Sequence, residues 1–205
     1  MKKYIAALAA FVLTISLCAS CSRGADGYDA YKEIYKRYSN IENFYAEAEI
    51  TVENPRTETV YHVRQSYTAP DSYTLVIDSP EALAGSGYVF RGGKATLKSG
   101  FGKDESVPSP APETRNCFFV NDFFAEYFGS EESAAKSSGG FSGGETALNC
   151  YISSGTSDKF RQTLTVDNKT FLPLKLTTYG TDGKPRVTVK FIEFRLNSDD
   201  GEIKF

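Results

Sequence analysis

The sequence predicts a mostly β protein of the α+β class, in which a strongly curved antiparallel sheet carries an N-terminal helix and an inserted short helix that cover its concave side. Three observations lead to this prediction. Apolar residues recur every three or four positions over 28–38 and then every second position along most of the chain. Short turns rich in Gly, Pro, Asn and Asp separate consecutive strands, which favours antiparallel pairing. A second helical, aromatic segment follows residue 121 and interrupts the strands.

The first half of the chain contains one helix and five strands by this pattern. The helix covers 28–38, where four tyrosines and Ile34 share one face between charged positions. Because alternation places one face of a strand on the core and the other in solvent, the strands form a sheet with one buried face. The expected strands cover 44–52, 57–67, 73–77, 88–90 and 95–98, and a two-glycine turn joins the last two.

The second half begins with the inserted helix, for which Asn121 is the expected N-cap. Residues 130–144 are rich in Ser and Gly and predict a mobile loop or linker. In the last strand the apolar positions change phase at Phe191–Ile192, which predicts a β-bulge. The four strands of this half are expected at 145–152, 159–166, 172–179 and 186–196.

The inserted helix has an aromatic face with two interpretations. It is either ordinary core, or the lining of an apolar cavity or partner-binding face, since a curved sheet covered by short helices can enclose a space. The candidate residues are Phe123, Phe124, Tyr127 and Phe128.

The N-terminus has the pattern of a secretory signal. Met1-Lys2-Lys3 supplies positive charge, and residues 5–17 form an apolar run. As a helix this run spans about 20 Å, which is shorter than the roughly 30 Å core of a bilayer. A permanent membrane span is therefore not expected.

Small residues directly precede Cys21 in Cys18-Ala19-Ser20-Cys21, which resembles the bacterial lipobox, whose cysteine receives a diacylglycerol group. We expect a signal peptide at 1–20, lipidated Cys21 with a tether at 21–27, and a single domain at 28–205. This arrangement predicts a protein on the extracytoplasmic face of a bacterial cell membrane, anchored there by lipid. An ordinary cleaved signal peptide without lipidation is the alternative.

Cys117 and Cys150 remain after the signal and the anchor. Two further cysteines in an exported protein favour a disulfide, which would stabilise the fold by roughly 2–4 kcal/mol. Two buried free thiols are the alternative.

Composition and motifs exclude several functions. The chain has 23 basic and 26 acidic residues, so its net charge of −3 does not fit nucleic-acid binding. Its single histidine, His62, cannot supply a site that needs two imidazoles. Ser142 lies in a G-x-S-x-G match, but a strand pattern follows it and no histidine comes later in the chain, unlike a nucleophile elbow. We predict no catalytic residue, no metal site and no cofactor.

Two segments resemble the LolA/LolB-like superfamily of lipoprotein carriers and their relatives. Residues 67–75 (YTAPDSYTL) are similar to a Y..P..Y.L step, and residues 164–176 (LTVDNKTFLPLKL) are similar to an l.vD..t.lP.kl hairpin of that superfamily. The resemblance covers most of the mature chain. It implies a half-barrel in which helices close the mouth of the curved sheet.

Within this superfamily, the anchor, the length and the Tyr-rich helix most resemble clostridial germination lipoproteins of the GerS type. That resemblance implies a non-enzymatic lipoprotein that binds and activates a zinc-dependent cell-wall amidase of the spore cortex, and that can form a strand-exchanged homodimer. The alternative is a LolA/LolB-like carrier or chaperone that binds lipid or lipoprotein acyl chains in an apolar cavity.

Overall fold

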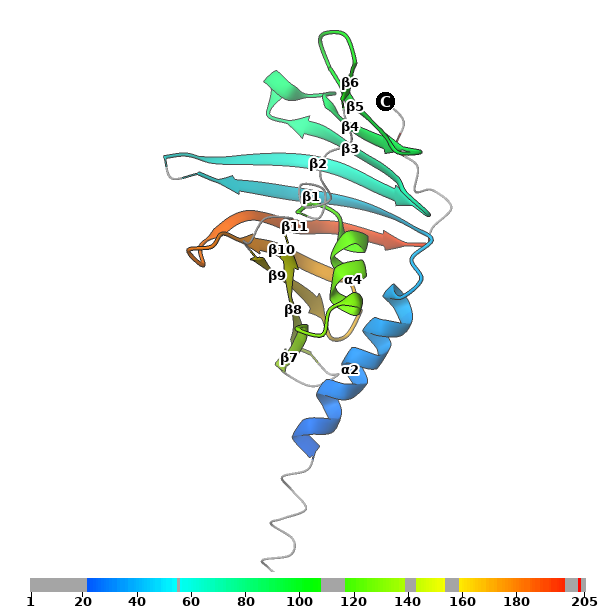
Figure 1. Cartoon of the computed structure of the whole chain (residues 1–205), viewed down its shortest axis with the longest axis vertical. Helices are drawn as coiled ribbons and strands as arrows, with labels where there is room; N and C mark the ends of the chain where they lie inside the picture. The colour runs from blue at the N-terminus through cyan, green and yellow to red at the C-terminus, as the bar shows by residue number, and fades with distance from the viewer. Residues whose placement is uncertain are drawn as a thin grey trace, which may run out of the picture.

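The computed structural model describes residues 22–54, 56–107, 117–138, 143–153, 159–197 and 203. Within them the strands form a single antiparallel, curved and open sheet of eleven strands, in the order β6-β5-β4-β3-β2-β1-β11-β10-β9-β8-β7 (Figure 1). The elements are α2 (Ser22–Tyr38), β1 (Asn43–Glu53), β2 (Glu58–Thr68), β3 (Ser72–Ser79), the 3-10 turn η1 (Glu81–Leu83), β4 (Gly87–Arg91), β5 (Lys94–Lys98), β6 (Glu105–Val107), α4 (Val120–Gly129), β7 (Ala134–Ser138), β8 (Glu145–Ser153), β9 (Lys159–Asp167), β10 (Pro173–Tyr179) and β11 (Pro185–Leu196).

The two helices lie on the same side of the sheet (Figure 1), where α2 contacts β7 and β8 and α4 contacts β8. Buried residues from both helices and from alternate positions of the strands belong to one apolar cluster. We call this the core face of the sheet and the opposite side the outer face. The arrangement confirms the predicted fold class, including the helical cover on one side.

Two rows of side chains cross the core face. Their neighbouring members are directly opposed, except that Phe194 lies opposite Ala46 and diagonal to Phe44. Such cross-strand pairs are the unit from which a sheet gains its packing energy. The aliphatic row runs over five neighbouring strands from β1 to β8 and is almost fully buried; it consists of Ile50, Val189, Leu176, Leu164 and Leu148. The aromatic row runs in the other direction from β11 to β4 and consists of Phe194, Phe44, Tyr67, Tyr73 and Phe90, with neighbouring ring centroids 5.1–5.9 Å apart.

The C-terminal end of α2 is fixed by the turn between β9 and β10. The Tyr38 hydroxyl donates a hydrogen bond of 2.8 Å to the Phe171 carbonyl oxygen, and Arg37 donates one of 2.7 Å to the carbonyl oxygen of Thr170. The Arg37 guanidinium also lies 5.0 Å from the ring centroid of Phe171. Burial raises the pKa of the Tyr38 hydroxyl, so this group stays a neutral donor.

The turn itself is held by two polar side chains of the l.vD..t.lP.kl segment. Asp167 Oδ1 accepts hydrogen bonds from the backbone N–H groups of Lys169 and Thr170, which lowers the pKa of its carboxyl group. Asn168 is buried and accepts a 2.6 Å hydrogen bond from the Thr146 hydroxyl of β8. The segment that carried the sequence resemblance therefore shapes the place where α2 docks.

Most predicted elements are confirmed, among them the bulge; β6 and η1 were not predicted, and three further details differ. The bulge falls at Ile192, the extra residue between Glu47↔Glu193 and Ala48↔Phe191. Residues 22–27, which we expected as a spacer, form the first turns of α2. Residues 134–138, expected in a loop, form the edge strand β7, because they pair with β8 along their whole length and contact α2. The N-cap of α4 is Phe119, and its side chain makes no capping hydrogen bond, so Asn121 is not the cap.

Candidate functional site

The predicted anchor, Cys21, lies outside the described residues. The described chain begins at Ser22, already within α2, so a lipid on Cys21 would join the domain directly at a helix end. No helix among the described residues has the length and apolar character needed to cross a membrane.

The aromatic face of α4 is packed inside the protein. Phe123, Phe124 and Tyr127 are 0–4% exposed, and Phe128 is half-buried. Phe124 stacks on Tyr38 of α2, with the ring centroids 4.3 Å apart. A side chain with almost no exposed surface borders no space that could hold water, so this part of the core face is filled by aromatic rings.

A polar junction connects the start of α4 to β3. The Tyr73 hydroxyl donates a 2.7 Å hydrogen bond to Asp122 Oδ1, and the Asn121 amide donates to both of these groups. The carboxylate lies in the first turn of the helix, where the helix dipole favours negative charge. The hydrogen bonds of Asn121 and Asp122 with Tyr73 therefore orient α4 on the sheet.

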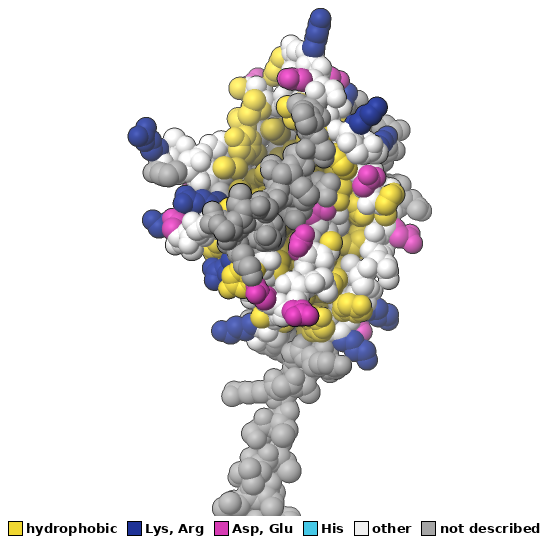
Figure 2. Space-filling view, viewed as in Figure 1, with side chains coloured by type: hydrophobic (Ala, Val, Ile, Leu, Met, Phe, Trp, Pro, Cys, Tyr) yellow, Lys and Arg dark blue, Asp and Glu magenta, His cyan; other side chains and the backbone are white. Residues whose placement is uncertain are grey.

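The core face is less covered towards β5. A row of directly opposed residues, Gln65, Leu75, Tyr88 and Leu97, leads from the buried interior outwards. Gln65 is fully buried, Leu75 and Tyr88 are half-buried, and Leu97 is 44% exposed. Figure 2 looks onto this side and shows hydrophobic side chains at the surface near the β3–β6 end of the sheet. The sheet thus has an apolar strip that neither described helix covers.

The two cysteines are both free thiols in the structure. Cys150 is fully buried on β8, and this burial raises the pKa of its thiol to about 12. Cys117 is half-buried, and burial raises the pKa of its thiol as well. A hydrogen bond between this thiol and Thr178 of β10 acts in the opposite direction but is the smaller effect. Both groups are therefore protonated near neutral pH, and the disulfide between them stays a prediction.

Ser142, of the G-x-S-x-G match, lies outside the described residues. His62 is exposed on the outer face of β2, and its Nε2 lies 4.0 Å from Glu49 Oε2. The part of the chain that the structure describes contains no group of three or more metal-binding side chains.

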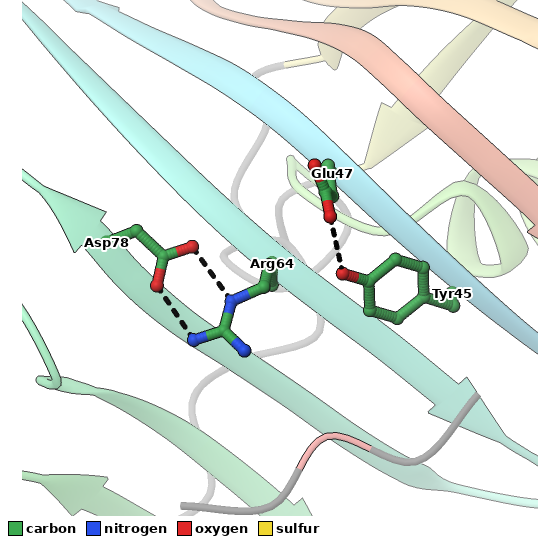
Figure 3. A network of polar contacts seen from close by, with 4 residues as sticks. All are labelled: Tyr45, Glu47, Arg64 and Asp78. Carbon is green, nitrogen blue, oxygen red and sulfur yellow. Dashed lines mark hydrogen bonds and ion pairs between the residues drawn. The ribbon is translucent and has the colours of Figure 1, made fainter. Parts of the chain in front are cut away.

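On the outer face, polar contacts link β2 to β3 and two residues within β1 (Figure 3). Arg64 donates two hydrogen bonds of 2.8 Å to the carboxylate of Asp78, and the Tyr45 hydroxyl donates one of 2.8 Å to Glu47. Burial and the carboxylate of Glu47 raise the pKa of Tyr45 to about 12. Ile203, near the C-terminus, packs on Tyr45 in a small apolar cluster. Opposite charges are therefore matched in this part of the outer face.

Another row on the outer face was not identified from the sequence. Tyr151, Arg161 and Tyr179 lie directly opposite one another on β8, β9 and β10. The Arg161 guanidinium lies 4.0 Å from the ring centroid of Tyr179, and Tyr151 is 45% exposed. The strand alternation places all three residues on the polar face, but only the pairing register shows that they are neighbours.

The fold and surface define a curved half-barrel domain with a packed aromatic interior under the helices and a polar outer face. The whole chain, residues 1–205, matches the family model described as sporulation protein YdcC-like, and the protein belongs to this family. No curated protein matches the chain at a significant level.

Solved structures with the same general architecture come from several bacteria. A conserved, uncharacterized protein from Thermus thermophilus is 11% identical over 82% of this chain and 88% of its own, with a TM-score of 0.52. A chain of the complex between the CwlD amidase and the GerS lipoprotein from Clostridioides difficile is 26% identical over 82% and 94%, with a TM-score of 0.49. A LolA superfamily protein from Nitrosomonas europaea is 12% identical over 82% and 93%, with a TM-score of 0.39.

We predict that Cys150 resists alkylation in the folded protein. A thiol pKa of about 12 leaves about a thousandfold less thiolate near pH 8 than an ordinary cysteine has, and burial also blocks the reagent. Peptide mass spectrometry after iodoacetamide treatment, with and without urea, measures this. Rapid labelling of Cys150 without urea would contradict the described packing. If neither Cys117 nor Cys150 is labelled in urea until a reductant is added, the two form a disulfide.

Proposed function

We propose that the protein is a lipoprotein of the extracytoplasmic face of the cell membrane, attached through Cys21, which binds a partner protein and catalyses no reaction itself. The observation that carries this proposal is the filled core face under α4 and α2. Where Phe124 and Tyr38 stack, a small molecule finds no open site, so the accessible surface available for recognition lies elsewhere on the sheet.

Membership of a sporulation family supports a role in the spore envelope. A domain held at a membrane by lipid is placed where cell-wall enzymes act. Together with the sequence resemblance to germination lipoproteins, this leads us to propose that the partner is a zinc-dependent cell-wall amidase that prepares the spore cortex for germination. In this scheme the partner supplies the metal and the chemistry, and the lipoprotein supplies location and activation.

A second candidate function is acyl-chain binding, as in lipoprotein carriers. The apolar strip that ends at Leu97 favours it, because an exposed apolar row beside a buried core can accept a hydrocarbon chain. Native mass spectrometry of the protein extracted from membranes distinguishes the two candidates. A bound acyl lipid at one equivalent favours the carrier, and lipid-free protein in complex with another protein favours the proposed function.

The anchor is tested by Cys21→Ser. Because a diacylglycerol group contributes about 0.8 kcal/mol per buried CH₂, its loss should move the protein from the membrane pellet to the soluble fraction. Fractionation followed by immunoblotting measures the shift, and Cys117→Ser is the matched control that should stay in the pellet. Undiminished retention of the Cys21→Ser protein would contradict lipid anchoring.

Partner binding is tested with the purified cell-wall amidase encoded in the same genome. We expect the mature, full-length lipoprotein in detergent to bind it with a Kd at or below about 1 µM, which corresponds to about −8 kcal/mol. We also expect the amidase to release more product from cortex peptidoglycan when the lipoprotein is present. Biolayer interferometry and a peptidoglycan cleavage assay measure these effects. If both proteins are folded and neither effect occurs, the amidase proposal is wrong.

A further inference from the structure

The outer face of β9, β10 and β11 has an excess of positive charge. Arg161 lies on β9, Lys175 on β10 and Lys190 on β11, and all three side chains are exposed. Each alternates with a residue of the core face, such as Leu176 or Val189, so all three point away from the helices. We call these three residues the cationic patch.

Two of the three patch cations, Arg161 and Lys175, lack the charge matching found elsewhere on this face, whereas Lys190 lies directly opposite Glu49 of β1. Arg64 pairs with Asp78 at 2.8 Å and Arg186 with Asp182 at 3.0 Å. No acidic group among the described residues lies within 4 Å of the patch cations. Instead, Lys175 and Lys190 lie directly opposite each other on adjacent strands. Like charges at such a position destabilise a sheet, and Glu49 offsets this effect only on the β1 side of Lys190. Lys175 has Thr165 and Lys190 as its register neighbours, so an acidic group of a partner would be favourable there.

Aromatic side chains flank one end of the patch. Arg161 lies between Tyr151 and Tyr179 in register, and its guanidinium rests on the Tyr179 ring at 4.0 Å. Stacking holds the guanidinium plane in place and leaves its N–H groups directed to the sides, where they can bind a carboxylate. Tyrosine and arginine together are typical of the residues that dominate protein–protein binding energy.

A row of hydroxyl groups connects the two ends of the patch. Thr163, Thr177 and Thr188 are directly opposed on the three strands, between the row of Arg161 and the row of the lysines. On the β8 side, Thr163 donates a 2.7 Å hydrogen bond to Asn149. On the β1 side, the patch ends at Glu49, which lies opposite Lys190. The strip between the cations is therefore uncharged, with Thr163 and Thr188 half-buried and Thr177 only 5% exposed.

We infer that the cationic patch is the docking surface for an acidic protein partner, with Arg161, Lys175 and Lys190 facing carboxylates and Tyr151 and Tyr179 packing beside them. This inference deepens the proposed function and rests on it, because it assigns the face that binds the amidase. Because the patch is positively charged, the partner surface that binds it should carry acidic residues. The tyrosines and the guanidinium held on Tyr179 favour a protein partner. An anionic lipid surface can be bound by flexible basic side chains without aromatic neighbours.

The test compares charge-reversed variants in binding to the purified amidase from the same genome. We expect Lys175→Glu with Lys190→Glu to weaken binding at least about tenfold, mainly through slower association, since charges at an interface steer the encounter. Arg161→Ala should weaken it further through faster dissociation. Raising NaCl from about 50 to about 300 mM should weaken wild-type binding and leave the double variant nearly unchanged. Interferometry measures both rate constants.

The matched control is Lys94→Glu with Lys103→Glu, which makes the same change of net charge. Both lysines are exposed; Lys94 lies on β5 and Lys103 lies between β5 and β6. This control should bind as the wild type does, and circular dichroism confirms folding of each variant. A wild-type complex that tolerates the patch reversals overturns this inference alone. The absence of any wild-type complex overturns the proposed function together with it. If the reversals instead abolish binding to vesicles containing phosphatidylglycerol and spare the amidase complex, the patch faces lipid and the inference is wrong.

Discussion

One constraint governs this structure: an eleven-stranded antiparallel sheet has a wide apolar face, and that face must be removed from water. Two described helices cover only part of it. They do so with flat, large side chains, and the stack of Phe124 on Tyr38 joins the helices above the aliphatic row of the sheet. The polar contacts of Tyr38 and Asp122 then fix each helix to a different region of the sheet. Rings bury much area for little lost side-chain entropy, which explains why aromatic residues are concentrated here.

This solution has a functional consequence. A curved sheet that kept its whole inner side open would suit a ligand carrier, whereas here the rings of α4 fill the part of that side that lies under the helices. The outer face is polar and has an ion pair between Arg64 and Asp78, whereas Arg161 and Lys175 have no acidic residue opposite them in register. This distribution of apolar and charged side chains favours the proposed binding of another protein by the sheet surface over catalysis. The proposed lipid anchor at Cys21 would then keep that surface near the membrane.

The sequence predicted the features that local patterns encode. The phase change at Ile192 identified the bulge, and alternation identified the core face of most strands. It did not predict β7, because Ala134–Ser138 has low strand propensity and owes its conformation to pairing with β8. The same limit applies to the candidate site. The aromatic residues of α4 were identified, but whether they lined a cavity or filled the core depended on Tyr38, eighty-six positions from Phe124. The neighbours of Arg161 depended on strand register, which a single strand does not reveal.

Native-state hydrogen exchange of α4 tests the central claim most directly. If the aromatic face of this helix is part of the core, the amides of Phe124 and Tyr127 should open with free energies within about 1 kcal/mol of those of Leu164 and Leu176, since they would be exposed only when the sheet itself unfolds. If the amides of α4 exchange through an opening that costs several kcal/mol less than that of the strands, the helix is a lid over a cavity, and the account of a filled core face is wrong.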